Sequence, residues 1–143
     1  MSGTGHTVKS YEEEMQSLND NLVMMGSLTE SQMADAMAAV IKVDKDSVDK
    51  IVKNDGKINE LRSVIDNQIT TVLVKRAPMA VDLRITISTM KISHDLERIG
   101  DLAKSVAKKV KPLPVDLPDE LIGSLRRLGD LVQKQLKDAL DAY

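Results

Sequence analysis

The chain has 143 residues, 42% of them hydrophobic and 29% charged, a composition typical of a single folded domain. It has no cysteine, which excludes disulfide scaffolds, thiolate metal sites and cysteine nucleophiles. A net charge of -2 and only 1% aromatic residues argue against a nucleic-acid partner, since basic surfaces and stacking platforms are lacking. The N-terminus has no signal-peptide pattern, and no apolar stretch approaches the roughly 20 residues of a membrane span. We therefore expect a cytoplasmic protein without direct membrane insertion.

The first expected element is one long helix from Val8 to Val43. This stretch contains no proline, and its apolar residues recur at nearly helical spacing. Those residues are Leu18, Leu22, Met25, Leu28, Met33, Met37, Val40 and Ile41. Gly26 lies inside the helix, where glycine costs about 1 kcal/mol relative to alanine. Its presence indicates either close packing or a break.

A second helix is predicted to follow the cluster Asp44-Lys45-Asp46-Ser47, because short oxygen-bearing side chains satisfy the first free amides of a helix. Its apolar stripe consists of Ile51, Ile58, Leu61, Ile65, Ile69 and Val72. The helix should end before Pro78, since proline disfavours helical backbone at the preceding residue.

A third helix should begin near Pro78 and has the clearest periodicity. Its expected core positions are Ile85, Ile92, Leu96, Ile99, Ala103, Val106 and Val110. The three prolines between residues 112 and 118 then predict a stiff linker. Pro118 suits the first turn of a fourth helix that runs to Tyr143.

The fourth helix repeats the pattern of the first. A shift of 129 minus 26, or 103 residues, places Gly26 on Gly129. Over residues 26–40 it aligns six identical residues, where about one is expected from average residue usage. Besides the glycines these are Leu28, Gln32, Asp35, Ala36 and Ala39. Although amphipathic helices resemble one another, we interpret the match as a duplicated three-helix unit.

The predicted fold is therefore all-α. An antiparallel three-helix bundle should occupy residues 7–111, a proline-rich linker residues 112–118, and the first helix of a truncated second repeat residues 119–143. A lone fourth helix would expose its leucine and valine stripe unless it docks on the first bundle or on another copy of the chain.

Pairs of oxygen-bearing side chains one helical turn apart are the candidate ligands. Glu97 and Asp101 lie about 40° apart around the third helix, and Asp55 and Asn59 have the same spacing in the second. Hard cations prefer such oxygen ligands, and adjacent antiparallel helices could bring both pairs to one site. The spacing alone favours a solvated helix face, and Glu97 and Asp101 are expected to point away from the hydrophobic seam. Gly100 indicates that a neighbouring helix packs closely there.

Two runs of residues resemble the PhoU family of phosphate-uptake regulators. They are Ala77-Pro78-Met79-Ala80-Val81-Asp82-Leu83-Arg84 and Leu96-Glu97-Arg98-Ile99-Gly100-Asp101. The likeness extends from His6 to the linker. The 103-residue duplication fits the family's two three-helix repeats, the second of them cut short in this sequence.

The resemblance implies a bacterial cytoplasmic adaptor, not an enzyme, that is a negative regulator of phosphate uptake and phosphate-starvation signalling. Its implied partners are the ATPase of a phosphate ABC transporter and a membrane sensor histidine kinase. We also expect a homo-oligomer, such as a homodimer.

The family's acidic E(D)xxxD motifs hold metal ions. The resemblance places them at Glu97 and Asp101 and, in the second helix, at Asp55 and Asn59. The implied ion is divalent or trivalent, with Mg, Mn, Fe and Zn all open. The sequence departs from the family at position 59, which is Asn where the fuller motif has a carboxylate, and it lacks the ligands of the second repeat.

Two alternatives remain open at this point. A purely structural helical scaffold predicts no bound metal and no loss of partner binding when Glu97 and Asp101 are replaced by alanine. A di-metal carboxylate enzyme of the ferritin-like kind requires Glu-x-x-His pairs directed into the bundle, and the sequence contains none.

Overall fold

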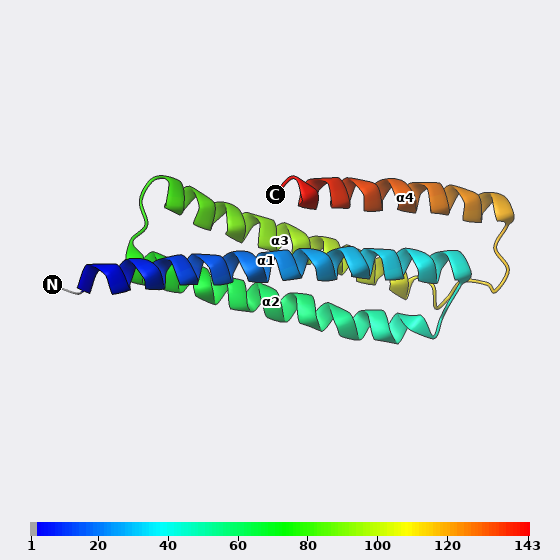
Figure 1. Ribbon diagram of the computed structural model, residues 1–143. Coiled ribbons are helices and arrows are strands. Elements are labelled where there is room, and N and C mark those ends of the chain that lie inside the picture. The colour runs from blue at the N-terminus through cyan, green and yellow to red at the C-terminus, as the bar shows by residue number, and fades with distance from the viewer. Residues whose placement is uncertain (1–2) are drawn as a thin grey trace.

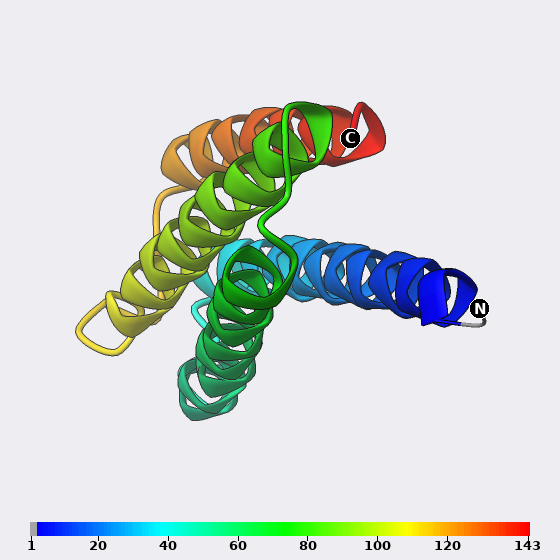
Figure 2. The ribbon, with the colours of Figure 1, turned by 90° about the vertical axis from the view of Figure 1, so that its left-hand side faces the viewer.

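The computed structural model describes residues 3–143, with side chains from residue 8 onward, so the side chain of His6 lies outside the described part. Four helices are present in this range: α1 (Gly3–Lys42), α2 (Ser47–Arg76), α3 (Val81–Lys108) and α4 (Asp119–Asp141) (Figure 1). Helices α1, α2 and α3 pack against one another as an antiparallel bundle, and α4 packs along α1. Figure 2 shows α4 on the side of α1 away from α2. The prediction of an all-α, three-helix bundle with a fourth helix is confirmed.

Two clusters of aliphatic side chains form the core. The first consists of Leu18, Leu22, Met25, Ile58, Ile65, Ile69, Leu96 and Leu136. The second, nearer the α1–α2 turn, consists of Ala36, Ala39, Val40, Val48, Ile51, Ala103, Ala107 and Val110. Each large aliphatic side chain contributes about 1.5–3 kcal/mol by its burial. Leu136 of α4 belongs to the first cluster, so the fourth helix shares the core of the bundle.

The ends of α2 follow from local chemistry. The Asp44 carboxylate accepts hydrogen bonds from the backbone amides of Asp46 (3.1 Å) and Ser47 (3.2 Å), as expected of a capping cluster. At the other end, Ala77 adopts a left-handed backbone conformation with φ 43°, which stops the helix just before Pro78. Helix α3 begins at Val81, close to the predicted start, after a turn in which Ala77 and Ala80 both have positive φ.

The core face predicted for the third helix is confirmed at Leu96, Ala103 and Val110, but the centre of the buried face of α3 is shifted toward smaller residues. The buried residues are Thr86, Thr89, Ser93, Leu96, Gly100, Ala103 and Ala107. Ile85, an expected core residue, is 45% exposed, and Ile92 and Ile99 are only partly buried. Close packing explains the shift, since a Cβ built on Gly100 would lie 3.0 Å from Cδ1 of Ile58. Small side chains therefore occupy the contact and larger ones flank it.

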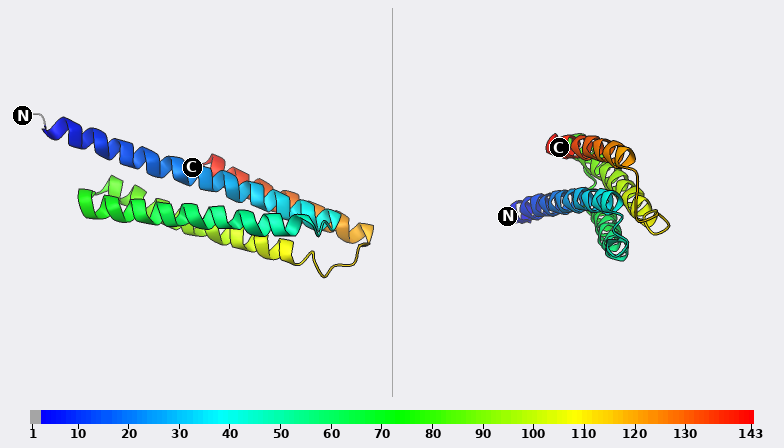
Figure 3. Two further views of the ribbon diagram at one scale, coloured as in Figure 1. Left: turned by 90° about the horizontal axis from the view of Figure 1, so that it is seen from below. Right: turned by 90° about the vertical axis from the view of Figure 1, so that its right-hand side faces the viewer.

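Helices α1 and α4 approach each other closely at two glycines. A Cβ built on Gly26 would lie 2.9 Å from Cδ2 of Leu140, and one built on Gly129 would lie 2.5 Å from Cε of Met37. The 103-residue shift relates residue 26 to 129 and also residue 37 to 140. Each helix thus offers equivalent positions to the other, as across an approximate two-fold axis. Figure 3 shows the two helices side by side and antiparallel.

The outer face of α4 is apolar and exposed. Leu121, Leu128 and Leu131 are 45%, 57% and 55% exposed. Their counterparts under the same shift are Leu18, Met25 and Leu28, which pack into the first core cluster. Docking on α1 therefore covers only one side of the leucine stripe. None of the described helices combines the length and apolarity that a membrane crossing needs.

The close approach at Gly129 can be tested with a matched pair of variants. Alanine at either Gly129 or Gly123 should gain about 1 kcal/mol of helix propensity. At Gly123 the new methyl group meets only Nη1 of Arg127, at 3.5 Å, whereas at Gly129 it displaces Met37. We expect Gly129→Ala to be less stable than Gly123→Ala by about 1–3 kcal/mol. Urea denaturation followed by circular dichroism measures the difference, and equal stabilities would contradict the packing.

Candidate functional site

The centre of the candidate site is the buried carboxylate of Asp55 in α2, whose side chain is 4% exposed. It accepts hydrogen bonds from Nε2 of Gln32 (2.9 Å), Nζ of Lys104 (2.6 Å) and Nδ2 of Asn59 (3.3 Å). Gln32 comes from α1 and Lys104 from α3. All three helices of the bundle therefore meet at one carboxylate.

Lys104 joins the acidic groups of α2 and α3. Its Nζ lies 2.6 Å from Oδ2 of Asp55 and 2.5 Å from Oδ1 of Asp101. The hydrogen bond from Lys104 lowers the pKa of Asp101, and the hydrogen bonds to Asp101 and Asp55 raise the pKa of Lys104. The structure thus brings Asp55 and Asp101 to one place, with an ammonium group between them.

Glu97 faces a different cationic side chain. Its Oε2 accepts a hydrogen bond from Nη1 of Arg62 at 3.3 Å. Arg62 Nε also lies 3.7 Å from Oδ2 of Asp66, and Asp66 Oδ1 lies 3.2 Å from Nε2 of His94. The facing surfaces of α2 and α3 therefore carry carboxylates that already have nitrogen partners.

The four predicted ligands differ in exposure. Asn59 is exposed, whereas the side chains of Glu97 and Asp101 are 20% and 46% exposed. The outward direction expected for Glu97 and Asp101 does not extend to Asp55, which is buried. Position 55 lies four residues after Ile51 and three before Ile58, so it falls within the buried stripe of α2. Asp55 therefore requires partners inside the protein.

The sequence-based prediction missed Gln32 and Lys104. Gln32 is 3% exposed and lies among the apolar residues of α1, and a polar residue in such a stripe is a signal of a buried polar contact. Lys104 follows Asp101 by three residues, the spacing of a helical ion pair. Both signals were available, but neither indicates a contact with α2.

The donor chemistry of the site suits a hard cation. Asp55, Asp101, Glu97 and Asn59 offer only oxygen ligands, which match Mg, Mn or Fe better than Zn, for which nitrogen and sulfur are common ligands. Oε1 of Gln32 is buried and has no hydrogen-bond partner. As the described side chains are arranged, no three His, Cys, Asp or Glu residues form a group that could hold a metal ion. The oxygen-bearing side chains suit such an ion chemically. The ammonium group of Lys104 lies between Asp55 and Asp101, the two carboxylates that would bind the ion.

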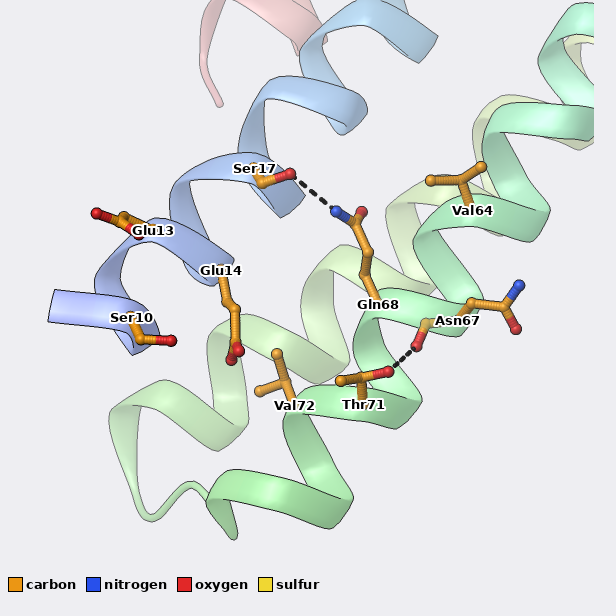
Figure 4. Close-up of a pocket in the computed structure, with 9 residues that line it drawn as sticks. All are labelled: Ser10, Glu13, Glu14, Ser17, Val64, Asn67, Gln68, Thr71 and Val72. Carbon is orange, nitrogen blue, oxygen red and sulfur yellow. Dashed lines mark hydrogen bonds between the residues drawn. The ribbon is translucent and has the colours of Figure 1, made fainter. Parts of the chain in front are cut away.

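Away from the carboxylate site, a groove of about 510 Å³ lies between α1 and α2 (Figure 4). Glu14, one of its lining residues, accepts hydrogen bonds from Nε and Nη2 of Arg76 at 3.0 and 2.9 Å. Nε2 of Gln68 donates to Oγ of Ser17 at 2.9 Å. These polar groups bind one another across the groove, so we assign them to the packing of α1 on α2.

The geometry defines a helical-bundle protein with a carboxylate cluster between two helices, and comparisons with known proteins agree with this class. The PhoU domain family matches residues 22–110. A phosphate-specific transport system accessory protein PhoU homolog from Caulobacter vibrioides is 43% identical over 98% of the chain and 61% of its own length. The homolog from Clostridium acetobutylicum is 35% identical over 96% of the chain and 63% of its own length.

Two crystal structures share the fold. PhoU from Pseudomonas aeruginosa superposes with a TM-score of 0.82 at 35% identity, covering 92% of this chain and 64% of that protein. The phosphate transport system regulatory protein PhoU from Streptococcus pneumoniae gives 0.83 at 30% identity, covering 93% and 62%. The chain therefore belongs to the PhoU family. It spans about three fifths of the length of these relatives, whose names describe accessory and regulatory proteins rather than enzymes.

Asp55 and Asp101, which share Lys104, should contribute differently to stability, because Asp55 is buried and Asp101 is half-exposed. Asp55→Ala removes the buried acceptor that the Lys104 ammonium and the Gln32 amide share and leaves them only Asp101 and the carbonyl oxygen of Gly100, so we expect a loss of about 1–3 kcal/mol in unfolding free energy. Asp101→Ala removes a half-exposed partner and should cost about 0–1 kcal/mol. Urea denaturation of both variants measures the contrast. Similar losses would show that Asp55 is not the buried anchor.

The ion pair at Glu14 predicts a pH dependence. The hydrogen bonds from Arg76 lower the pKa of Glu14 below its usual 4.5. The folded protein therefore binds this proton less readily than the unfolded chain, and the stabilisation is complete above pH 4.5. We expect the stability difference between wild type and Glu14→Gln to shrink as the pH falls through the lowered pKa.

Thermal unfolding across this pH range measures the effect, with Glu13→Gln as the control for loss of a neighbouring exposed carboxylate. A Glu14→Gln difference that does not change with pH would contradict the role of Arg76.

Proposed function

We propose that the chain is a negative regulator of phosphate uptake and of phosphate-starvation signalling. It acts in the cytoplasm as a metal-binding adaptor between a phosphate ABC transporter, through its ATPase, and a sensor histidine kinase, and it assembles as a homo-oligomer. No chemical reaction is part of this function.

The observation that carries the proposal is membership of the PhoU family over residues 22–110. The similar proteins are named for the phosphate-specific transport system or for regulation of phosphate transport. An identity of 43% over 98% of the chain supports a related role for this protein. The transporter and the kinase as partners come from the family resemblance.

The carboxylate cluster supports the metal-binding part. Asp55 and Asp101 converge from two helices, and Glu97 and Asn59 lie one helical turn from them. A hard cation would supply positive charge that joins α2 to α3. The protein's own residues position the site, because Gly100 allows α2 to approach and its carbonyl oxygen accepts a hydrogen bond from Nε2 of Gln32 at 3.0 Å.

The turn between α2 and α3 supports an adaptor role. Val74, Met79 and Val81 are 79%, 82% and 66% exposed at this end of the bundle. Large apolar side chains that gather on a surface favour contact with another protein. A ferritin-like di-metal enzyme is not supported, since the candidate ligands lie between two helices and not around a central cavity. A plain scaffold would account for the ion pairs of Asp55 and Asp101 with Lys104, but it does not account for membership of the PhoU family over residues 22–110.

The proposal is tested in a bacterium that lacks the gene encoding the chain. Loss of a negative regulator should raise phosphate uptake and switch on a phosphate-starvation reporter in phosphate-rich medium. The wild-type gene should restore repression. Glu97→Ala/Asp101→Ala should fail to restore it, and the purified double variant should contain less metal than wild type while keeping its helicity.

Asp119→Ala/Glu120→Ala, which removes two acidic residues at the exposed start of α4, is the matched control and should behave as wild type. Failure of the wild-type gene to restore repression would refute the regulatory function. Equal metal content in wild type and the Glu97/Asp101 variant would refute the site.

A further inference from the structure

We propose that Lys104 is an internal cation that competes with the metal ion for the carboxylates of Asp55 and Asp101, so that the site accepts metal only when this side chain moves out. The inference rests on the metal-binding part of the proposed function. It concerns a residue of this chain that the spacing of the acidic pairs does not indicate.

The first argument is the position of the ammonium group. Its nitrogen lies 2.6 Å from an oxygen of Asp55 and 2.5 Å from an oxygen of Asp101. Oxygen ligands lie at about 2.0–2.6 Å from Mg²⁺ or Ca²⁺. A metal ion that bridges the same two oxygens would occupy nearly the same volume. The ammonium group and the ion therefore exclude each other by size and by charge.

The second argument is the burial of Asp55. A carboxylate with 4% exposure is costly in an aliphatic core unless a positive charge or several donors accompany it. The two remaining donors, the amides of Gln32 and Asn59, carry no net charge. One cation is therefore required beside Asp55, and either the ammonium group or a metal ion meets the requirement.

The third argument is that the Lys104 side chain can leave the site and reach solvent. Its side chain is 21% exposed, and lysine carries its charge on a flexible four-carbon stem. It can swing from Asp55 into solvent without crossing the core, while α3 stays in place. Exchange of the ammonium group for a metal ion then needs no opening of the bundle. Oε1 of Gln32 is buried without a partner, and rotation of this amide by 180° would turn that oxygen toward Asp55 as an added ligand for the ion.

The test is Lys104→Gln, which removes the charge but keeps an N–H donor for Asp55. Lys108→Gln is the matched control, because it removes the same charge one turn further along α3 from an exposed position. The full chain is titrated with Mn²⁺ as the probe, and free Mn²⁺ is followed by electron paramagnetic resonance. We expect Lys104→Gln to bind Mn²⁺ at least about tenfold more tightly than wild type, a change of the size that groups around a metal site produce. Lys108→Gln should stay close to wild type.

Thermal unfolding provides the second measurement. Without metal, Lys104→Gln should melt several degrees below wild type, and Mn²⁺ should raise its melting temperature more than that of wild type. If Lys104→Gln is unfolded without metal, folding on addition of Mn²⁺ supports the inference, and failure to fold with Mn²⁺ overturns it.

The outcomes separate this inference from the proposed metal site. Equal Mn²⁺ affinity in wild type and Lys104→Gln overturns the competition but leaves the site intact. Equal tightening in Lys104→Gln and Lys108→Gln also overturns it, because general charge then explains the effect. If Lys104→Gln binds Mn²⁺ while wild type and Lys108→Gln do not, the inference is supported, and Lys104 then keeps Mn²⁺ out of the wild-type site. No binding by any of the three proteins overturns both.

Discussion

Burial of the Asp55 carboxylate constrains the whole three-helix bundle. A charged group in an aliphatic core costs several kcal/mol unless other groups compensate it. Gln32 from α1 and Lys104 from α3 supply that compensation across helix boundaries. Sliding any of the three helices along its neighbours would remove a donor, so one carboxylate fixes their relative register. Gly100 permits the arrangement, since a side chain there would press on Ile58.

How much the sequence could predict depends on how local each feature is. The start of α2 at Ser47 and its end before Pro78 follow from capping and from proline, which act within a few residues. Periodicity found Leu96 and Ala103 on the buried face of α3 but not Thr86 or Ser93, because hydrophobicity favours Ile85 over Thr86, whereas close helix packing favours small side chains. Spacing likewise identified Asp101 but not Lys104 as part of the site, since the contact of Lys104 with Asp55 depends on the neighbouring helix.

The relation between α1 and α4 accounts for the uneven covering of the fourth helix. Gly26 and Gly129 lie at equivalent positions in the contact between the two helices. Beyond that contact, α2 and α3 cover the side of α1 that carries Met25, whereas the corresponding Leu128 of α4 is 57% exposed. The exposed leucines of α4 thus occupy positions that, in α1, are filled by residues of the core. The 103-residue shift in the sequence and the geometry of the contact describe the same relation.

The proposed exchange at Lys104 changes charge more than shape. With the ammonium group between Asp55 and Asp101, two negative charges and one positive charge leave a net negative site. With a divalent ion in its place and the lysine in solvent, the two carboxylates and the ion form a neutral site. Asp55 has a cationic partner in both states, so its buried charge stays compensated and the helices keep their register. A protein that contacts the α2–α3 surface would therefore distinguish the two states by electrostatics, which act on binding without any rearrangement of the bundle.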